Sequence, residues 1–422
     1  MNSEINPMNI YTFNEVADIN PSRTVKKGTV TKYLSMDSVE PRHKHVSKIE
    51  YRKYNGGSKF KKNDILFARI TPSLEHGKTC IVDFLEEGEI GAGSTEFIVI
   101  SSKDGLTIPD YLYYLTTSNL VREPAIKSMT GTSGRQRVDT SVFDSIIVPI
   151  PPLNEQKAIT KILSDLDSKI ELNQKMNKIL EAIAQAIFKH WFIDFEFPNE
   201  EGKPYKSSGG EMVDSELGEI PKGWNVEPLG SVLSLLKDGT HLPPKRVDKG
   251  FKFIAGATDV KHFFVDFSKC TYITKEEYQK IHKKWTLRPD DILLTIVGTL
   301  GNVAIVRERD LPFSMQRSIA LLRVSEKIPY SYLYFLLNSD FFKGELQKRI
   351  NPTAQPGIYL TELSKIKIIV PNKRIADLFH SVAQSFIKFM QSRIDNSDIL
   401  TDLRDSLLPK LISGKVRVPL EE

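Results

Sequence analysis

The sequence predicts an α+β protein in which two mixed α/β globular regions are separated by two long antiparallel coiled-coil helices and related by an internal pseudo-twofold repeat. Three observations predict this fold class. Short motifs recur at a nearly constant offset along the 422 residues. Runs typical of β-strands alternate with turn residues in two regions. Each region is followed by a long stretch with apolar residues at helical spacing.

Three short motifs indicate the repeat, because they recur in the same order. The matching pairs are Asp64–Leu66 with Asp291–Leu293, Tyr111–Leu115 with Tyr332–Leu336, and Ile146–Pro149 with Ile368–Pro371, at offsets of 227, 221 and 222. The alternative is that common strand and helix fragments match by chance. The shared order and offset favour a duplicated chain.

The repeat divides the chain into segments. The first globular region spans 1–152 and the second spans 220–371; each holds short β-type runs, a helical stretch and a final strand that proline stops. Examples of these runs are 65–68, 97–100 and 292–297, and the helical stretches lie near 110–127 and 330–348. Residues 198–219 are predicted to be a linker, since Pro198 to Gly210 is polar and rich in Gly, Pro and Ser.

Two long helices are predicted in 153–197 and 372–422. No Pro or Gly interrupts the chain from Asn154 to about Phe195, and the second helix runs from about Arg374 to Ile412. Steps of three and four residues select the expected contact positions. These are Leu163, Leu166, Ile170, Leu180, Ala184, Ile187 and Trp191 in the first helix, and Val382, Phe386, Phe389, Leu400, Leu403 and Leu407 in the second.

Both helices have a polar gap at their centre. Asn173 and Asn177 fill the first seam, and Arg393 and Asn396 occupy intermediate positions in the second. One interpretation is a solvated stretch. The other is that these side chains meet between the helices and fix their register, as a buried Asn does in coiled coils. Matched gaps fit an antiparallel pair that crosses at its midpoint.

The composition is that of a globular protein of two or three domains, with 40% hydrophobic and 26% charged residues. No apolar run is long enough for a transmembrane helix, and the N-terminus lacks the pattern of a signal peptide. Two cysteines, Cys80 and Cys270, are too few for a disulfide framework or a cysteine-based zinc site. A cytoplasmic location is the simplest expectation.

The net charge of +5 is weak and unevenly distributed. Residues 1–152 hold 19 basic and 18 acidic residues, 153–200 hold 6 and 8, 201–371 hold 25 and 20, and 372–422 hold 8 and 7. Phosphate contacts dominate DNA affinity. This excess therefore argues against a tight stand-alone DNA binder, but allows a protein that recognises DNA while a partner supplies backbone contacts.

Catalytic motifs are missing from the sequence. It contains no P-loop, no His-Glu-x-x-His and no Gly-x-Ser-x-Gly, and its eight histidines are scattered. Asn351-Pro352-Thr353 is only a fragment of an adenine-methylase motif, and Pro289-Asp290 lacks the later residues of a nuclease motif. We therefore expect neither an active site nor a metal site, and no cofactor in this chain.

Polar loops offer candidate DNA contacts in both regions. Arg and Lys pair with guanine or phosphate, Gln pairs with adenine, Ser and Thr serve either, and glycine allows close backbone approach. The candidates in the first region are Arg69, Thr71, Ser73, His76, Lys78, Thr132, Ser133, Arg135, Gln136 and Arg137. Those in the second region are Lys237, Thr240, His241, Gln316, Arg317, Thr353 and Gln355.

The alternative is that these are ordinary solvated loop residues. The loop at 350–357 occupies the place of 129–138 in the second half, and it keeps a Gln but loses the arginines. If the loops recognise bases, the two halves are expected to recognise different sequences.

Two helical motifs resemble a known family, the specificity subunits of type I restriction-modification systems. Pro151–Ile159, followed by Leu163, Leu166, Asp167 and Ile170, resembles the family's central conserved region, and Arg404–Val416 resembles its C-terminal conserved region. Gly93–Phe97 and Ile220–Trp224 also fit it. The resemblance covers essentially the whole chain, with the globular regions matching loosely.

The resemblance implies two target-recognition domains, each recognising one half of a split DNA sequence, with the helices setting the spacer. It also implies two N6-adenine methyltransferase subunits docked on the helices, and motor-nuclease subunits in the full complex. The partners would use S-adenosylmethionine, ATP and magnesium. The implied docking residues are Glu155, Gln156, Ile159, Leu163, Leu407, Leu408 and Leu411.

One departure affects the docking expectation. The second half has Lys373-Arg374-Ile375-Ala376 where the first has the Glu155-Gln156 pair, so the two docking surfaces need not be equivalent. Two other functions compete with DNA recognition. One is a helical scaffold that joins two protein partners without recognising DNA. The other is a fused enzyme, which the missing motifs disfavour.

Overall fold

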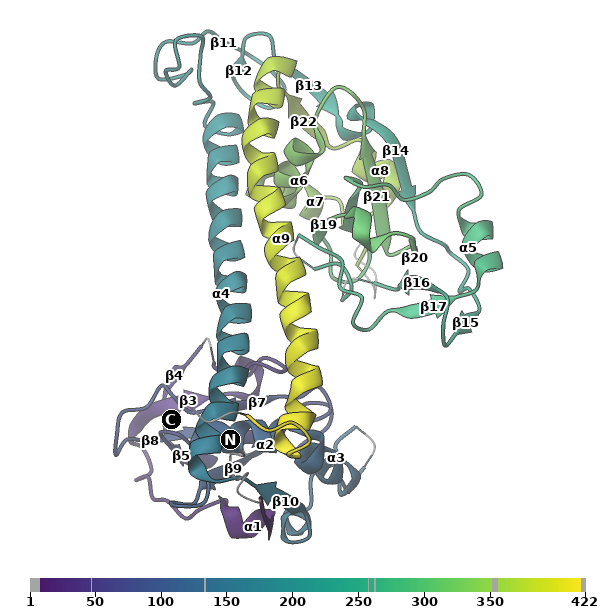
Figure 1. The fold of residues 1–422 in the computed structure, drawn as a ribbon. Helices are drawn as coiled ribbons and strands as arrows, with labels where there is room; N and C mark the ends of the chain where they lie inside the picture. The colour runs from purple at the N-terminus through teal and green to yellow at the C-terminus, as the bar shows by residue number, and fades with distance from the viewer. Residues whose placement is uncertain are drawn as a thin grey trace, which may run out of the picture. The chain divides into compact units, whose positions relative to one another are not determined.

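A computed structural model describes residues 8–46, 48–132, 134–256, 258–261, 263–350 and 356–418. The chain forms two compact units. Unit 1 comprises residues 1–175 and 393–422, and unit 2 comprises residues 176–392. Both units include part of each of the two long helices, α4 (Leu153–Phe192) and α9 (Lys373–Ile412) (Figure 1). Each unit therefore contains one globular region and one segment of each long helix.

Unit 1 contains two four-stranded sheets and a two-stranded pair, β1 with β10. The main sheet has the order β2-β9-β6-β7, and the small sheet has the order β4-β3-β8-β5, in which β3 and β8 are parallel. The strands are β1 (Asn9–Thr12), β2 (Ala17–Ile19), β3 (Val30–Leu34), β4 (Glu50–Lys53), β5 (Ser58–Lys61), β6 (Ile65–Ala68), β7 (Thr79–Ile81), β8 (Ile90–Gly93), β9 (Phe97–Ser102) and β10 (Ile147–Ile150). The helices are α1 (Phe13–Val16), α2 (Pro109–Thr117) and α3 (Asn119–Lys127), with 3-10 turns η1 (Met36–Ser38) and η2 (Thr140–Asp144).

Unit 2 repeats this plan. Its main sheet has the order β14-β21-β18-β19, its small sheet β15-β17-β16-β20, and β13 pairs with β22. The strands are β11 (Met212–Val213), β12 (Ile220–Pro221), β13 (Asn225–Pro228), β14 (Leu233–Asp238), β15 (Arg246–Val247), β16 (Phe251–Ile254), β17 (Thr271–Ile273), β18 (Ile292–Thr295), β19 (Val303–Ile305), β20 (Phe313–Met315), β21 (Ile319–Val324) and β22 (Lys367–Val370). The helices are α5 (Lys275–Ile281), α6 (Tyr330–Asn338), α7 (Asp340–Gln347) and α8 (Leu360–Ser364), with 3-10 turns η3 (Leu229–Val232) and η4 (Glu308–Asp310).

The register confirms that the units are repeats. Ala68 of β6 pairs with Phe97 of β9, and Thr295 of β18 pairs with Ile319 of β21 in the same way. All four residues of β6 are buried, and so are all four of β18, which explains why these strands are continuous apolar runs in the sequence. The units differ in the fourth strand of the small sheet. In unit 1, β5 pairs with β8, which is one strand of the parallel pair. In unit 2, β15 pairs with β17 and so lies at the other edge of the sheet.

The helix segments pack against the globular core inside each unit. In unit 1, Ile159 and Leu163 of α4 and Leu411 of α9 belong to the buried cluster around the main sheet. In unit 2, the Phe188 ring of α4 lies 5.4 Å from Tyr332 of α6 and 5.7 Å from Phe379 of α9. Helix α6 thus lies between its sheet and the helix pair (Figure 1).

The contact positions of the second helix differ from the prediction. The Phe389 side chain is 61% exposed and Leu403 is 44% exposed, whereas Ala383, Ile387 and Met390 are buried. Val382, Phe386, Leu400 and Leu407 are half-buried. Two apolar rows run side by side on α9, one residue apart, and periodicity alone does not select between them. The row that contains the small Ala383 packs inward.

The first helix follows the prediction more closely. Leu163, Ile170 and Ala184 are buried, while Leu166, Leu180, Ile187 and Trp191 are half-buried. The inward rows of the two helices match at an offset of 220. They are Glu155, Gln156, Ile159, Leu163, Asp167 and Ile170 in α4, and Ile375, Ala376, Phe379, Ala383, Ile387 and Met390 in α9.

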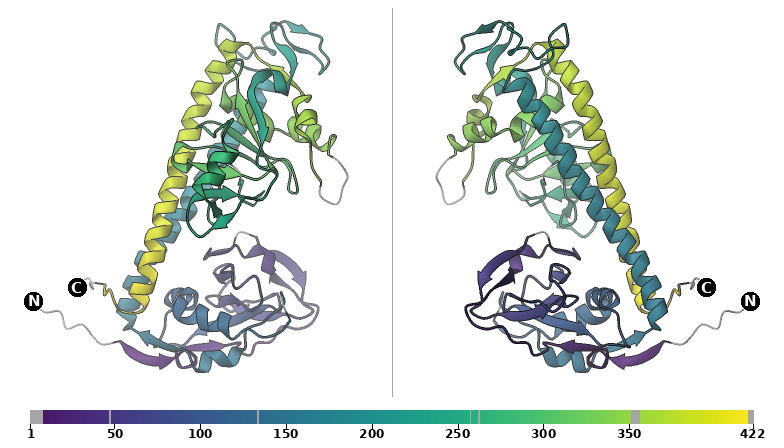
Figure 2. Two further views of the ribbon diagram at one scale, coloured as in Figure 1. Left: turned by 90° about the vertical axis from the view of Figure 1, so that its right-hand side faces the viewer. Right: turned by 90° about the vertical axis from the view of Figure 1, so that its left-hand side faces the viewer.

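The polar gap is an interhelical seam, as the second interpretation of the sequence predicted. In unit 1, buried Asn173 donates from Nδ2 to Asn396 Oδ1 (3.1 Å) and Ser397 Oγ (3.2 Å), and Arg393 donates to Asn173 Oδ1 (3.4 Å). In unit 2, Asn177 donates to the Met390 carbonyl oxygen (3.2 Å). The segments are antiparallel within each unit, and the views in Figure 2 show α4 and α9 side by side.

The linker is held by aromatic packing, although its sequence predicted only a polar loop. The Phe197 ring stacks 4.5 Å from Tyr205 and 4.9 Å from Trp224. The chain after α4 is therefore pinned to the start of the second globular region.

Candidate nucleic-acid interface

Two loops of unit 1 that are distant in the sequence form one site. Val138 N donates to Arg69 O (2.8 Å), and Thr71 N donates to Gln136 O (3.0 Å). Gln136 N donates in turn to Thr71 Oγ1 (3.0 Å). The two constellations that the sequence suggested separately are thus one paired element at the end of β6.

A short hairpin carries the second loop. Thr130 and Arg137 exchange backbone hydrogen bonds of 3.0 and 2.8 Å, and this pairing closes the tip. Gly131 has φ +124°, and a Cβ there would lie 3.1 Å from the Arg135 carbonyl oxygen. The tip therefore needs glycine. It leaves Thr132 and Arg135 exposed, and Ser133 lies outside the described residues.

Several predicted residues of the first loop make internal bonds. Thr71 is buried and accepts the Gln136 N–H described above. Lys78 donates from Nζ to the Met36 carbonyl oxygen (2.9 Å) and from its backbone to Ser73 O (3.0 Å). His76 is exposed, and Arg69 and Ser73 are half-buried. Thr71 and Lys78 thus shape the loop, while His76 and Arg69 remain the better candidates for contact with a ligand.

Glu96 is a member of this site that the loop analysis missed. Its carboxylate accepts from Arg137 Nε (3.0 and 3.1 Å) and from Arg137 NH2 (2.6 Å). Its carbonyl oxygen accepts from Arg69 N (2.9 Å). The only signal in the sequence was that Gly93–Phe97 fits the family pattern.

Unit 2 reproduces this backbone pairing with different side chains. Ile358 N donates to Ile296 O (3.0 Å), and Gly298 N donates to Pro356 O (2.9 Å). Ile296, Pro356 and Gly357 therefore stand where unit 1 has Arg69, Gln136 and Arg137. The predicted residues Thr353 and Gln355 lie outside the described residues.

The other candidates of unit 2 gather around a second loop. Thr240 N donates to Met315 O (3.0 Å), and Arg317 N donates to Thr240 O (3.1 Å). His241 Nε2 lies 2.7 Å from Asp238 Oδ2. Thr240, His241, Gln316 and Arg317 are thus brought together, while Lys237 lies within strand β14. By register, Gln316 and Arg317 correspond to Ser94 and Thr95 of unit 1.

Positive charge is concentrated in the two sequence segments that contain most strands of the small sheets. Residues 26–62, which include β3, β4 and β5, hold 11 basic and 3 acidic residues, and 245–288, which include β15 to β17, hold 11 and 5. The rest of the chain holds 36 basic and 45 acidic residues. The sequence segments placed the excess in the second region alone. Both units carry a basic segment. In unit 1, acidic residues elsewhere in the globular region cancel its excess charge.

An arginine stacks on the equivalent aromatic residue in each small sheet. The Arg52 guanidinium lies 4.5 Å from the Tyr33 ring centre, and Arg246 lies 3.9 Å from that of Phe253. In unit 1, Tyr33 and Arg52 also line a groove of about 470 Å³ that extends to Ser94 and Thr95. The groove thus adjoins the segment that contains Glu96.

The implied docking residues have internal partners in unit 1. Glu155, Gln156, Ile159, Leu163 and Leu411 are each at most 3% exposed, and Leu407 and Leu408 pack half-buried on the same core. The Glu155 carboxylate accepts two hydrogen bonds of 2.5 Å from Arg417. These side chains attach α4 and the C-terminal segment to the globular core, so a partner could not reach the buried ones without opening the unit.

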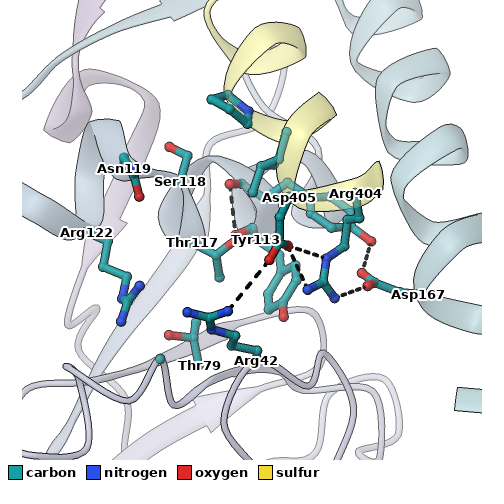
Figure 3. A pocket seen from close by; sticks show the side chains of 14 residues that line it. Arg42, Thr79, Tyr113, Thr117, Ser118, Asn119, Arg122, Asp167, Arg404 and Asp405 are labelled. Carbon is teal, nitrogen blue, oxygen red and sulfur yellow. Dashed lines mark hydrogen bonds and ion pairs between the residues drawn. The ribbon is translucent and has the colours of Figure 1, made fainter. Parts of the chain in front are cut away.

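A second cavity of unit 1, of about 270 Å³, is lined by a charged network (Figure 3). Arg404 donates to Asp167 Oδ1 (2.7 Å), and Tyr114 donates to Asp167 Oδ2 (2.6 Å). Burial and then the charge of Asp167 raise the pKa of Tyr114. Arg42 lies 3.6 Å from Asp405. The network joins α9, α4 and α2, and its charged groups pair with one another.

The described part of the chain contains no group of three His, Cys, Asp or Glu residues that could hold a metal ion. None of its helices is long and apolar enough to cross a membrane. Cys80 is buried and Cys270 is half-buried, and both are free thiols.

Comparison with known proteins finds the same duplication, because one family model matches the chain twice. The family described as type I restriction modification DNA specificity domain matches residues 6–182 and 221–397. The MjaVIII specificity subunit of Methanocaldococcus jannaschii is 29% identical over 336 residues, covering 78% of this chain and 76% of that protein. The HindI specificity subunit of Haemophilus influenzae is 25% identical over 438 residues, covering 89% and 91%. The solved S subunit from M. genitalium matches 98% of this chain and 97% of its own, with 18% identity and a TM-score of 0.48.

Proposed function

Because this chain belongs to the family of type I restriction-modification DNA specificity proteins, we propose that units 1 and 2 each recognise one half of a bipartite DNA target. One observation carries the proposal. The same backbone pairing supports Arg69, Gln136 and Arg137 in unit 1, and Ile296, Pro356 and Gly357 in unit 2. A shared frame with different side chains suits two recognition sites that differ in sequence.

The side chains of unit 1 suit the edges of bases. Arg pairs with guanine O6 and N7, and Gln pairs with adenine N6 and N7, in the major groove. Exposed Arg135 stands on a glycine-containing tip, which brings the backbone close to a ligand. In unit 2, Thr240, His241, Gln316 and Arg317 take this role.

The small sheets are proposed to contact the DNA backbone. The exposed basic residues of segments 26–62 and 245–288 supply the phosphate contacts that set register and affinity without sequence information. The remaining chain is acidic overall, which limits how tightly the protein binds DNA alone. A complex with other subunits would add backbone contacts.

The long helices are proposed to set the spacer between the half-sites and to dock two methyltransferase subunits. Exposed apolar pairs at repeat-equivalent positions support this stoichiometry. Ile179 and Ile183 of α4 are 59% and 43% exposed, and Ile399 and Leu403 of α9 are 63% and 44% exposed. Two matched patches fit two copies of one partner, and these exposed residues replace the buried ones as our docking candidates.

Catalysis is assigned to the partner subunits. We infer that S-adenosylmethionine, ATP and magnesium serve the methyltransferase and motor-nuclease subunits, and that this chain contributes specificity without a cofactor. A cytoplasmic location follows from the proposed substrate, the DNA of the cell. Incubating the purified chain with each cofactor and DNA tests this assignment, since methylation or cleavage would support the fused-enzyme alternative.

Region exchange tests the central proposal. Residues 1–152 are replaced by the same region of a relative, the methyltransferase complex is reassembled, and methylated sites are mapped by sequencing. We expect one half-site to change and the other to persist; exchange of residues 220–371 provides the reciprocal control. A change in both half-sites would contradict the two-site proposal, and sequence-independent methylation would support the scaffold alternative.

A further inference from the structure

Arg137 and Glu96 form a bidentate ion pair beside the loops of unit 1. Glu96 takes the side edge of the guanidinium, where Nε and NH2 donate over 2.6–3.1 Å. The Arg137 side chain is 46% exposed and that of Glu96 is 22% exposed. The pair therefore lies at the surface, with its carboxylate end more enclosed.

The backbone of Arg137 is fixed on both sides. It pairs with Thr130 across the hairpin and forms an antiparallel bridge with Ile70. Arg137 thus extends from a paired element, whereas Arg135 stands at the tip, outside this pairing. A residue held by both its backbone and its side chain loses little freedom on binding, which favours specific recognition.

The geometry leaves one edge of Arg137 available. A guanidinium has five N–H donors and two edges that each form paired bonds. Glu96 occupies the Nε/NH2 edge, and NH1 has no hydrogen-bond partner within the described residues. The NH1/NH2 edge can therefore donate two parallel bonds, and guanine offers two matching acceptors, O6 and N7.

Unit 2 lacks both members of the pair. Gly357 takes the place of Arg137 in the bridge with Val297. Ser318 takes the place of Glu96, since Ile296 N donates to Ser318 O (2.8 Å) as Arg69 N donates to Glu96 O (2.9 Å). Unit 1 thus has both the carboxylate and the arginine, and unit 2 has neither. This pattern links Glu96 to Arg137.

We propose that Glu96 is a positioning residue that holds Arg137 to recognise a guanine in the half-site of unit 1, and that unit 2 has no such contact. The inference rests on the proposed function. A carboxylate repels phosphate, so this location favours a base edge over the DNA backbone for Arg137.

The test uses the full chain in complex with its methyltransferase subunit. After the target is mapped by methylation sequencing, Arg137→Lys and Glu96→Gln are compared with the unmodified chain on DNA carrying each base at each position. Arg137→Lys keeps the charge but loses the planar paired donors. We expect it to lower discrimination at one guanine of half-site 1 by roughly 5- to 150-fold, the range for a bidentate base contact.

Glu96→Gln is expected to lower discrimination at the same guanine by roughly 2- to 5-fold, since exposed ion pairs contribute little. In the Arg137→Lys background it should have no further effect on that position. Binding to nonspecific DNA should stay equal or become tighter, because a negative charge is removed. Glu211→Gln, which breaks the exposed linker pair with Lys222, is the matched control and should change no position.

Three outcomes would overturn the proposal. They are a loss of discrimination at a base other than guanine, a loss of discrimination in the half-site of unit 2, and an equal effect of Glu96→Gln with and without Arg137. Thermal melts confirm that each variant folds. Region exchange separates this inference from the proposed function. If exchange changes one half-site while Arg137→Lys leaves it intact, only the Glu96–Arg137 proposal fails.

Discussion

Replacing Gln156 by alanine should destabilise unit 1 out of proportion to the size of the change. The side chain is fully buried. It donates to Leu106 O (2.7 Å) and Pro151 O (2.9 Å), and it accepts from Ile108 N (3.0 Å). One buried amide thus satisfies three backbone groups that join α4 to the globular region.

The magnitude follows from these bonds. Leaving the buried Ile108 N–H unpaired costs about 1–3 kcal/mol, and the two carbonyl bonds contribute about 0.5–1.5 kcal/mol each. Releasing the side-chain entropy of glutamine offsets about 1.5–2 kcal/mol. We expect a net loss of about 0–4.5 kcal/mol in the free energy of unfolding, centred near 2 kcal/mol.

The assay is urea unfolding followed by far-UV circular dichroism. Gln185→Ala is the matched control, because Gln185 also lies on α4 but makes a single 3.3 Å bond, to Phe335 O. That bond contributes about 0.5–1.5 kcal/mol, and release of the glutamine side-chain entropy offsets it, so the expected net cost of the control is close to zero. A Gln156→Ala loss no larger than that of Gln185→Ala would refute the reasoning, since it would mean that water or relaxation satisfies the three groups.

Three further predictions address recognition, docking and pH. Arg135→Ala should weaken specific DNA binding by the methyltransferase complex and lower its salt dependence, measured by titration at several salt concentrations; unchanged binding would place the tip away from DNA. Ile183→Asp and Leu403→Asp should each reduce the bound methyltransferase from two copies to one, measured by analytical ultracentrifugation, and retention of two copies would contradict the docking patches. The hydrogen bond to Asp83 raises the pKa of His45 above its usual 6.5. The folded state therefore binds the proton more tightly, and the stabilising effect of His45 is fully present below pH 6.5 and disappears as pH rises through the folded pKa. The stability difference between the unmodified chain and His45→Gln should shrink across that range, and a difference that grows with pH would reverse the assignment.

The sequence was sufficient for the repeat, the two long helices and the polar seam at Asn173, because each depends on local periodicity or direct comparison of the halves. It did not determine which row of α9 packs inward. Val382 and Ala383 are neighbours on adjacent apolar rows, and the choice depends on how closely the helices approach.

The recognition loops were identified as polar segments, but their mutual pairing was not. Arg69 and Val138 are brought together only by the tertiary fold, and no local pattern announces a contact over that sequence distance. Glu96 was overlooked because one acid after a strand is unremarkable until its arginine partner is placed. The roles of Ser133, Thr353 and Gln355 remain predictions.

The hairpin frame shared by the units has a consequence for mutational tolerance. Its backbone bonds form with Arg69, Gln136 and Arg137 in one unit and with Ile296, Pro356 and Gly357 in the other. The backbone pairing therefore forms with different side chains. At the exposed positions, Arg137 and Pro356, substitutions usually change stability by less than about 0.5 kcal/mol. New specificities can thus be sampled at these positions by successive mutations that leave the folded state stable.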